Sequence, residues 1–153
     1  MLDRTKRLTT AIALLASLLV SLPMAQGQAN AKEKHKKCVV NHKASRSYTR
    51  VPYSSPEYNK RFANSYMSAK YDWCGEQYSC LVTLWNHESG WRTKAHNSSS
   101  GAHGVPQALP GNKMGKGWQN NPQVQIKWGL KYIRIRYGTP CGAWSAWQRK
   151  GWY

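Results

Sequence analysis

Carboxyl groups are scarce in the C-terminal half of this sequence, so the residues able to perform acid–base chemistry can be named individually. From position 71 onward the only acidic residues are Asp72, Glu76 and Glu88. Glu88 follows Leu81 and Trp85 at helical spacing, which places its carboxyl on the apolar face of a helix. Burial against apolar groups raises the pKa of a carboxyl. A carboxylic acid that is still protonated near neutral pH can protonate a glycosidic oxygen, so Glu88 is the candidate catalytic acid.

A second catalytic carboxylate is not expected. Asp72 and Glu76 stand at the start of a predicted helix, where the macrodipole stabilises negative charge. Glu76 precedes Glu88 by about 18 Å along a helix that rises 1.5 Å per residue, whereas a retaining glycosidase needs its two carboxylates about 5 Å apart. Glu88 is therefore predicted to work alone, with the substrate supplying the nucleophile. The residues alone leave one alternative open, in which Glu88 is an ordinary hydrogen-bonded residue at a helix end.

Tryptophan is concentrated in the same region, since all eight tryptophans fall between Trp73 and Trp152. Aromatic rings stack on the apolar faces of sugars and also build small cores. Helical spacing assigns Trp85 and Trp128 to the core. Positions in or beside loops make four others candidates for sugar contact: Trp91, Trp118, Trp144 and Trp147.

Three helices are predicted to position these residues. The first begins at Ser55-Pro56-Glu57, which supplies an N-cap, a proline at the first helical position and an early acid. The second runs from Glu76 to Glu88 and ends at Ser89-Gly90. The third begins at Asn121-Pro122 and has Gly138 as its C-cap. The apolar stripe of the first helix is Tyr58, Phe62, Tyr66 and Ala69, and that of the second is Tyr78, Leu81, Val82 and Trp85. The stripe of the third helix is Ile126, Leu130, Ile133 and Tyr137, widened by Val124, Trp128 and Ile135.

Residues 91–121 are rich in Gly, Ser, Asn and Pro, which predicts loops with at most short helical turns around Val105 to Leu109. No alternating pattern typical of strands and no internal repeat occurs. The predicted fold class is therefore mainly α, with long loops.

The N-terminal region has the layout of a secretory signal peptide over residues 1–31. Basic residues precede an apolar run over positions 8–22, which is shorter than the roughly 18 residues that a membrane-spanning helix needs. Cleavage after Ala31 would release a protein that begins at Lys32, with no permanent membrane anchor. Residues 32–56 are basic and polar, which predicts a flexible arm ahead of one domain at 57–153.

Charge and cysteine content further limit the partners. Lys and Arg number 23 against six acidic residues, for a net charge of +17, and such a field attracts polyanions. For a secreted protein these are anionic wall polymers, peptidoglycan carboxylates or acidic lipids rather than nucleic acid; the alternative is that the charge only maintains solubility. Four cysteines in an exported chain predict disulfides, with three possible pairings, rather than a metal site. They are Cys38, Cys74, Cys80 and Cys141.

Four stretches of the sequence together resemble a known family. They are NHESGW at 86–91 and NSSSGAHGVPQALP at 97–110, followed by QIKWGL at 125–130 and YGTPCGAW at 137–144. The chain resembles the transglycosylase SLT (lysozyme-like) superfamily over about residues 76–153, most closely its small secreted actinobacterial-type members. The resemblance implies a lysozyme-like, goose-type/SLT helical domain and a monomer that acts on peptidoglycan glycan strands without a cofactor or metal.

The resemblance also implies residue roles. Glu88 would protonate the β-1,4 bond between N-acetylmuramic acid and N-acetylglucosamine, then act as a base toward the muramyl 6-hydroxyl and leave a 1,6-anhydro end. By position, Ser89, Gln107 and Tyr132 are substrate-positioning or acid-orienting candidates. Trp91, as a sugar contact, and His103, in a slot usually held by another aromatic residue, are the remaining substrate-binding candidates. The alternatives are a helix cap for Ser89, a loop hydrogen bond for Gln107 and core packing for Tyr132. The implied disulfides are Cys80–Cys141 and, as the remaining pair, Cys38–Cys74.

Two other functions compete with the lytic transglycosylase. The first is a hydrolytic muramidase on the same fold, in which water replaces the 6-hydroxyl. The second is a non-catalytic cationic protein that binds the cell wall or acts as an antimicrobial. Its support is the basic arm and the tryptophans, and an intact Glu88 argues against it.

Overall fold

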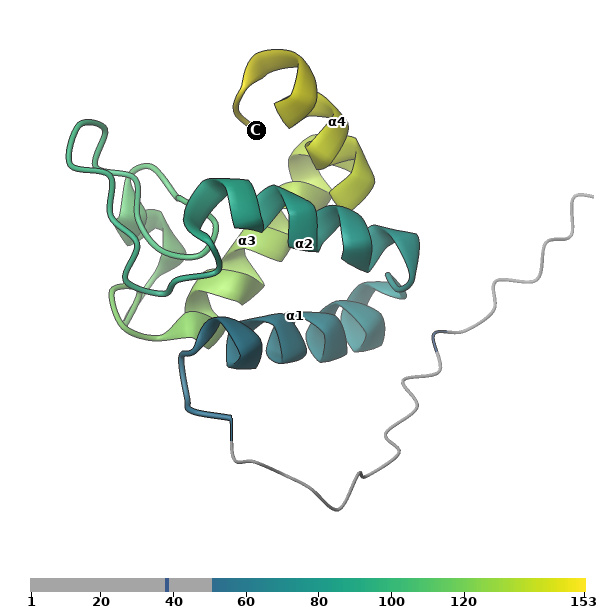
Figure 1. Cartoon of the computed structure of the whole chain (residues 1–153), viewed down its shortest axis with the longest axis horizontal. Helices are drawn as coiled ribbons and strands as arrows, with labels where there is room; N and C mark the ends of the chain where they lie inside the picture. The colour runs from purple at the N-terminus through teal and green to yellow at the C-terminus, as the bar shows by residue number, and fades with distance from the viewer. Residues whose placement is uncertain (1–37, 39–50) are drawn as a thin grey trace, which may run out of the picture. The chain divides into compact units, whose positions relative to one another are not determined.

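The part of the chain that the structure describes contains four α-helices and one short 3-10 helix. The computed structural model describes residue 38 and residues 51–153, which belong to one compact unit, His35–Tyr153. The predicted signal peptide and most of the predicted arm lie outside these residues. The elements are α1 (Pro56–Tyr71), α2 (Glu76–Ser89), η1 (Gly111–Met114), α3 (Pro122–Tyr137) and α4 (Pro140–Lys150) (Figure 1). The prediction of a mainly helical chain is confirmed.

Local sequence signals begin each of three helices in the same way. A side-chain oxygen accepts backbone N–H groups at the N-cap of α1 (Ser55), α3 (Asn121) and α4 (Thr139), and proline follows each cap. Helix α2 ends at Gly90, whose φ of 58° lies in the left-handed region that favours glycine. The predicted starts of α1, α2 and α3 and the predicted ends of α2 and α3 are confirmed to within one residue. Helix α4 was not predicted.

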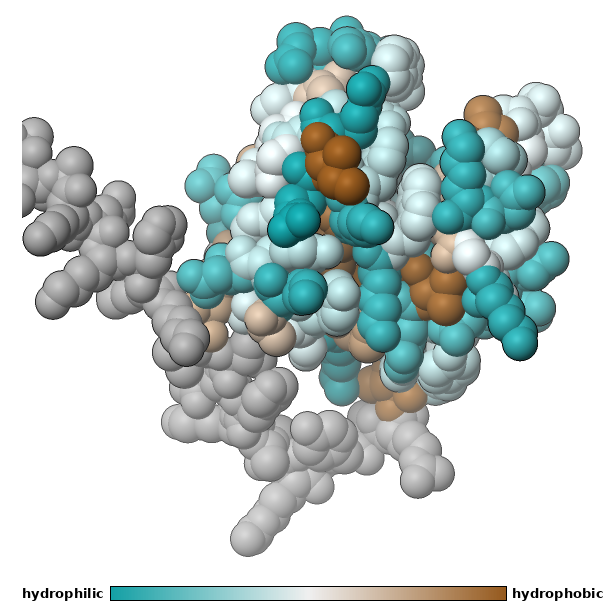
Figure 2. All heavy atoms as spheres, turned by 180° about the vertical axis from the view of Figure 1, so that it is seen from behind, coloured by the Kyte–Doolittle hydropathy of each residue, from teal (hydrophilic) through white to brown (hydrophobic). Residues whose placement is uncertain are grey.

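The core contains residues of all four α-helices and of the loop between α2 and α3. Helix α1 packs against α3, and α4 packs against both α2 and α3. Five residues of the predicted stripes lie outside this core: Tyr58, Ala69, Val124, Trp128 and Ile135. Ala69 is exposed, because α1 buries the neighbouring face that carries Ala63 and Met67. Ile135 is 65% exposed, and Trp128 is only partly buried. The face opposite that of Figure 1 is mostly hydrophilic, with strongly hydrophobic residues in separate spots (Figure 2).

A buried glutamine of α3 holds the long loop between α2 and α3. Gln125 is completely buried, and its Oε1 accepts the Val105 N–H at 2.9 Å. Its Nε2 donates to the Thr93 carbonyl at 3.0 Å and to the Trp118 carbonyl at 2.6 Å. Three distant loop segments thus converge on one amide. The turn over residues 104–107 contains no helix, and the only short helix in residues 91–121 is η1, so the predicted helical turn was placed too early.

Replacing Gln125 with Leu is expected to lower the free energy of unfolding by about 3 kcal/mol, because a buried N–H and two carbonyls lose their partners. Urea denaturation measures the change. Gln148→Leu is the matched control, since Gln148 is exposed on α4. Equal stability of the two variants would contradict a role for Gln125 in holding the loop.

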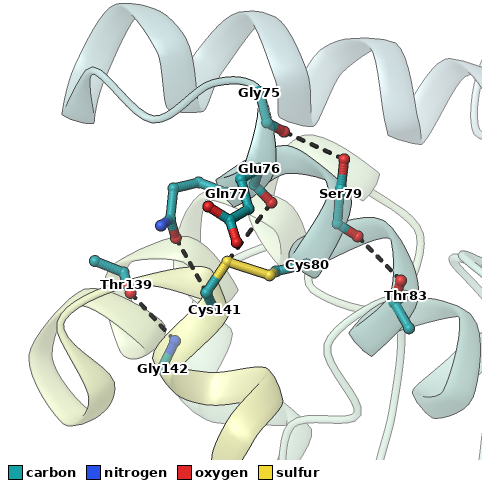
Figure 3. The surroundings of a disulfide bond; sticks show 9 residues. All are labelled: Gly75, Glu76, Gln77, Ser79, Cys80, Thr83, Thr139, Cys141 and Gly142. Carbon is teal, nitrogen blue, oxygen red and sulfur yellow. Dashed lines mark hydrogen bonds between the residues drawn. A yellow bond between two sulfur atoms is a disulfide. The ribbon is translucent and has the colours of Figure 1, made fainter.

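Two disulfides join parts of the described chain. Cys80 is bonded to Cys141, and Cys38 is bonded to Cys74, so both pairings implied by the resemblance are present. The first bond ties α2 to the first turn of α4, where the Cys141 N–H also donates to the Gln77 side chain at 3.1 Å (Figure 3). None of the described helices combines the length and apolar character needed to cross a bilayer.

Candidate active site

A cleft of about 830 Å³ opens at the C-terminal end of α2, and Glu88 lines it. Its walls come from the last turn of α2, the loop over residues 97–109, α3, and the segment from Trp147 to Tyr153. Among the described residues that line this cleft, Glu88 is the only one with a carboxyl group on its side chain. Aromatic side chains make up much of the rest: Trp128, Tyr132, Trp147, Trp152 and Tyr153.

The surroundings of Glu88 favour its protonated form. Burial in the last turn of α2 raises the pKa of Glu88, and a hydrogen bond from the Trp147 side chain partly opposes this by stabilising the carboxylate. No cationic side chain of the described residues contributes to the shift. The carboxyl therefore stays protonated at pH values where an exposed glutamate has lost its proton.

Tyr153 forms the wall of the cleft next to Glu88. Its hydroxyl accepts a hydrogen bond from the Trp85 indole at 2.8 Å and donates to the Pro106 carbonyl at 3.1 Å. Burial raises the pKa of Tyr153 well above its ordinary value, and the nearby charge of Glu88 adds to the shift. The hydroxyl thus joins α2 to the 104–107 turn across the back of the site.

Two aromatic stacks flank the cleft. Trp128 and Tyr132 of α3 lie parallel with ring centroids 5.3 Å apart. In α4, Trp144 and Trp147 stack at 5.2 Å, and His87 of α2 packs on Trp147 at 4.5 Å. Flat, partly exposed rings of this kind can stack on the apolar faces of sugar rings. The assignment of Trp128 to the core is therefore wrong, because its ring forms part of the cleft wall.

Only some of the predicted site residues meet at this cleft. Gln107 and Tyr132 line it with Glu88. The Gln107 Nε2 also donates to the Gly104 carbonyl at 2.9 Å, so the loop hydrogen bond considered as its alternative role is present. Gln107 has a φ of 51°, a backbone conformation that is uncommon for residues other than glycine.

The other three candidates do not line the cleft. Ser89 is buried and its hydroxyl donates to the Val105 carbonyl at 2.8 Å, so it joins α2 to the loop that forms one wall. Trp91 is completely buried and its indole donates to the Val82 carbonyl at 3.2 Å. It belongs to the core, which corrects its assignment as a sugar contact. The His103 ring lies edge-on to Trp118, with Nε2 at 3.2 Å from the Gln119 carbonyl.

Two features of the site escaped sequence reasoning. Tyr153 and Trp152 lie beyond any predicted element, and only the Trp-Tyr pair itself could have marked them. Gly129 lies where α3 crosses Trp85 and Pro106; a Cβ there would be 2.8 Å from a carbon of each. The absence of a side chain at Gly129 allows α3 to approach α2 closely enough to bring Tyr132 to the cleft.

The described residues contain no group of three or more histidine, cysteine or acidic side chains that could hold a metal ion. Comparisons with protein families, with curated proteins and with solved structures found no match to this chain.

The raised pKa of Glu88 predicts a pH-dependent loss of stability. The folded chain holds this proton at pH values where the unfolded chain, with an ordinary carboxyl pKa near 4.5, has released it. The free energy of unfolding therefore falls as the pH rises from about 4.5 through the raised pKa. Glu88→Gln cannot ionise, so its stability relative to the wild type should increase over this range in urea denaturation.

Glu76→Gln serves as the control for removing one negative charge, because Glu76 is exposed at the start of the same helix. A wild-type advantage over Glu88→Gln that grows with pH would mean that the folded state favours the carboxylate, which would contradict the prediction.

Proposed function

We propose that this protein is a secreted, lysozyme-like lytic transglycosylase that cleaves the bond between N-acetylmuramic acid and N-acetylglucosamine in peptidoglycan. The observation that carries the proposal is a single carboxyl group, Glu88, with a raised pKa in an aromatic-lined cleft. Such a group can donate a proton to a leaving oxygen at pH values where an ordinary glutamate is already ionised.

The proposed reaction uses Glu88 twice. In the first step its proton passes to the glycosidic oxygen, and the bond from that oxygen to C1 of the muramyl sugar breaks with the electron pair leaving on oxygen. In the second step the Glu88 carboxylate takes the proton of the muramyl 6-hydroxyl, and O6 bonds to C1. The product is a 1,6-anhydro end, and Glu88 regains its proton.

The lone carboxylate favours this route over one with a protein nucleophile. Glu76 and Asp72 are exposed and neither lines the cleft. Asp72 instead accepts the Cys38 N–H at 3.0 Å beside the Cys38–Cys74 bond. A nucleophile supplied by the substrate removes the need for a second carboxylate about 5 Å from Glu88.

The cleft walls supply sugar contacts for this proposal. Trp128 and Tyr132 of α3, and Trp147 of α4, offer flat faces on which sugar rings can stack. Gln107 and Asn97 also line the cleft and add polar groups. The two disulfides are compatible with an oxidising compartment outside the cell.

Mass spectrometry of the soluble products tests the proposal. Purified peptidoglycan is incubated with the protein, and the reaction should release muropeptides whose anhydro ends are lighter by one water than ends formed by hydrolysis. Products with reducing ends would instead identify a hydrolytic muramidase. The absence of products would favour the cationic wall-binding protein.

A further inference from the structure

A second hollow, of about 520 Å³, lies between α1 and α3 and shares Trp128 with the cleft. We call it the basic groove. Its lining residues are Tyr66, Lys70, Tyr71, Met114, Val124, Lys127, Trp128, Lys131 and Arg134. Four of these nine carry a positive charge, and none is acidic.

Three of the four cations of the basic groove lie in a row along α3. Lys127, Lys131 and Arg134 follow one another at helical spacing, so they share one face of α3, and Lys70 comes from α1 on the opposite side. All four are exposed. The row presents several positive charges to one ligand over the length of about two helical turns.

Aromatic rings hold two of these cations in place. The Lys127 ammonium lies 5.6 Å from the ring centre of Tyr66, and the Arg134 guanidinium lies 5.5 Å from that of Tyr71. Both distances are within the range of a cation–π interaction. Such contacts restrict the side chains without neutralising them, so their charges remain available to an anion.

From these observations we propose that the basic groove binds the carboxylates of the peptide stems carried by the glycan strand that occupies the cleft. The inference rests on the proposed function, which places a glycan strand against Trp128. A ligand that passes over Trp128 reaches the groove directly, and the free carboxylates of peptide stems are the anionic groups of peptidoglycan itself. Charge complementarity and the shared wall thus point to the same ligand.

Binding of two soluble ligands tests the inference: glycan strands that keep their peptide stems, and the same strands after the stems have been removed. The groove variant is Lys131→Gln with Arg134→Gln. The control variant is Lys116→Gln with Arg149→Gln, which removes the same charge from exposed residues that line neither the groove nor the cleft. All are made in a Glu88→Gln background to prevent turnover during titration.

We expect the Kd for stem-bearing strands to be about fivefold higher in the groove variant than in the control variant, because the groove variant loses two solvated ion pairs. For stem-free strands the two variants should bind alike. Equal effects of both variants on stem-bearing strands would show only general attraction by net charge and overturn the inference. An equal loss for both ligands in the groove variant would assign the groove to the sugars and overturn it as well.

A phosphate-rich wall polymer is the competing anion. If the groove variant loses binding only to wall preparations that keep their phosphate polymers, then that polymer occupies the groove and the inference is wrong. A different measurement tests the proposed function itself: it fails if the wild-type protein releases no cleavage products. The Kd values test only the groove.

Discussion

Replacing Glu88 with Gln is expected to lower the rate of glycan cleavage by at least about 100-fold, the usual contribution of a general acid. Gln fills almost the same volume and can hydrogen-bond to Trp147, but it has no proton to give to the glycosidic oxygen. The release of anhydromuropeptides per unit time from purified peptidoglycan measures the effect. Binding of glycan strands should change little, because the cleft walls are unaltered.

Glu76→Gln is the matched control for this experiment. It removes a carboxylate from the other end of the same helix, outside the cleft, and it should retain full activity. If Glu88→Gln released products at the wild-type rate, Glu88 would not be the acid, and no other acidic side chain among the described residues lines the cleft to replace it.

Loss of the Cys80–Cys141 bond is expected to lower the free energy of unfolding by about 4 kcal/mol in the chain-entropy model, because the bond closes a loop with a sequence separation of 61. The variant is Cys80→Ser with Cys141→Ser, and denaturation in urea measures the change. Activity should fall too, because the bond fixes α4, which carries Trp147, against α2, which carries Glu88.

The second disulfide provides the comparison. Cys38→Ser with Cys74→Ser opens a loop with a sequence separation of 36, and no described residue of that loop lines the cleft. It should destabilise the protein while leaving the rate of cleavage by the remaining folded molecules unchanged. Equal loss of that rate in both variants would show that neither bond acts specifically on the cleft.

Helix ends were the part of this fold that local sequence predicted well. A capping side chain followed by proline, as at Ser55 and Asn121, satisfies free backbone groups within a few residues of itself, so no tertiary information is needed to locate it. The same signal is present at Thr139-Pro140, with Gly151 at the far end. Helix α4 could therefore have been predicted from these residues.

Burial was harder to predict, because it depends on which neighbours arrive. Trp91 follows a helix end and looked like a loop residue, yet it packs in a T-shaped arrangement on Trp85 at 5.0 Å in the core. Trp128 has the spacing of a core residue but lies between two hollows. For the same reason Gln125 could not be recognised as the residue that holds the loop, since its three partners come from separate segments.

The contacts of Tyr153 also determine when during folding the site can form. The residues joined by its hydroxyl, Trp85 and Pro106, lie 68 and 47 positions earlier in the sequence. Helix α2 can form locally long before these pairings exist, but its Glu88 is then surrounded by water and titrates as an ordinary glutamate. The surroundings that raise the pKa of this carboxyl are complete only when the segment that follows α4 has docked. A chain that has not finished folding therefore carries Glu88 without the raised pKa on which the proposed function depends.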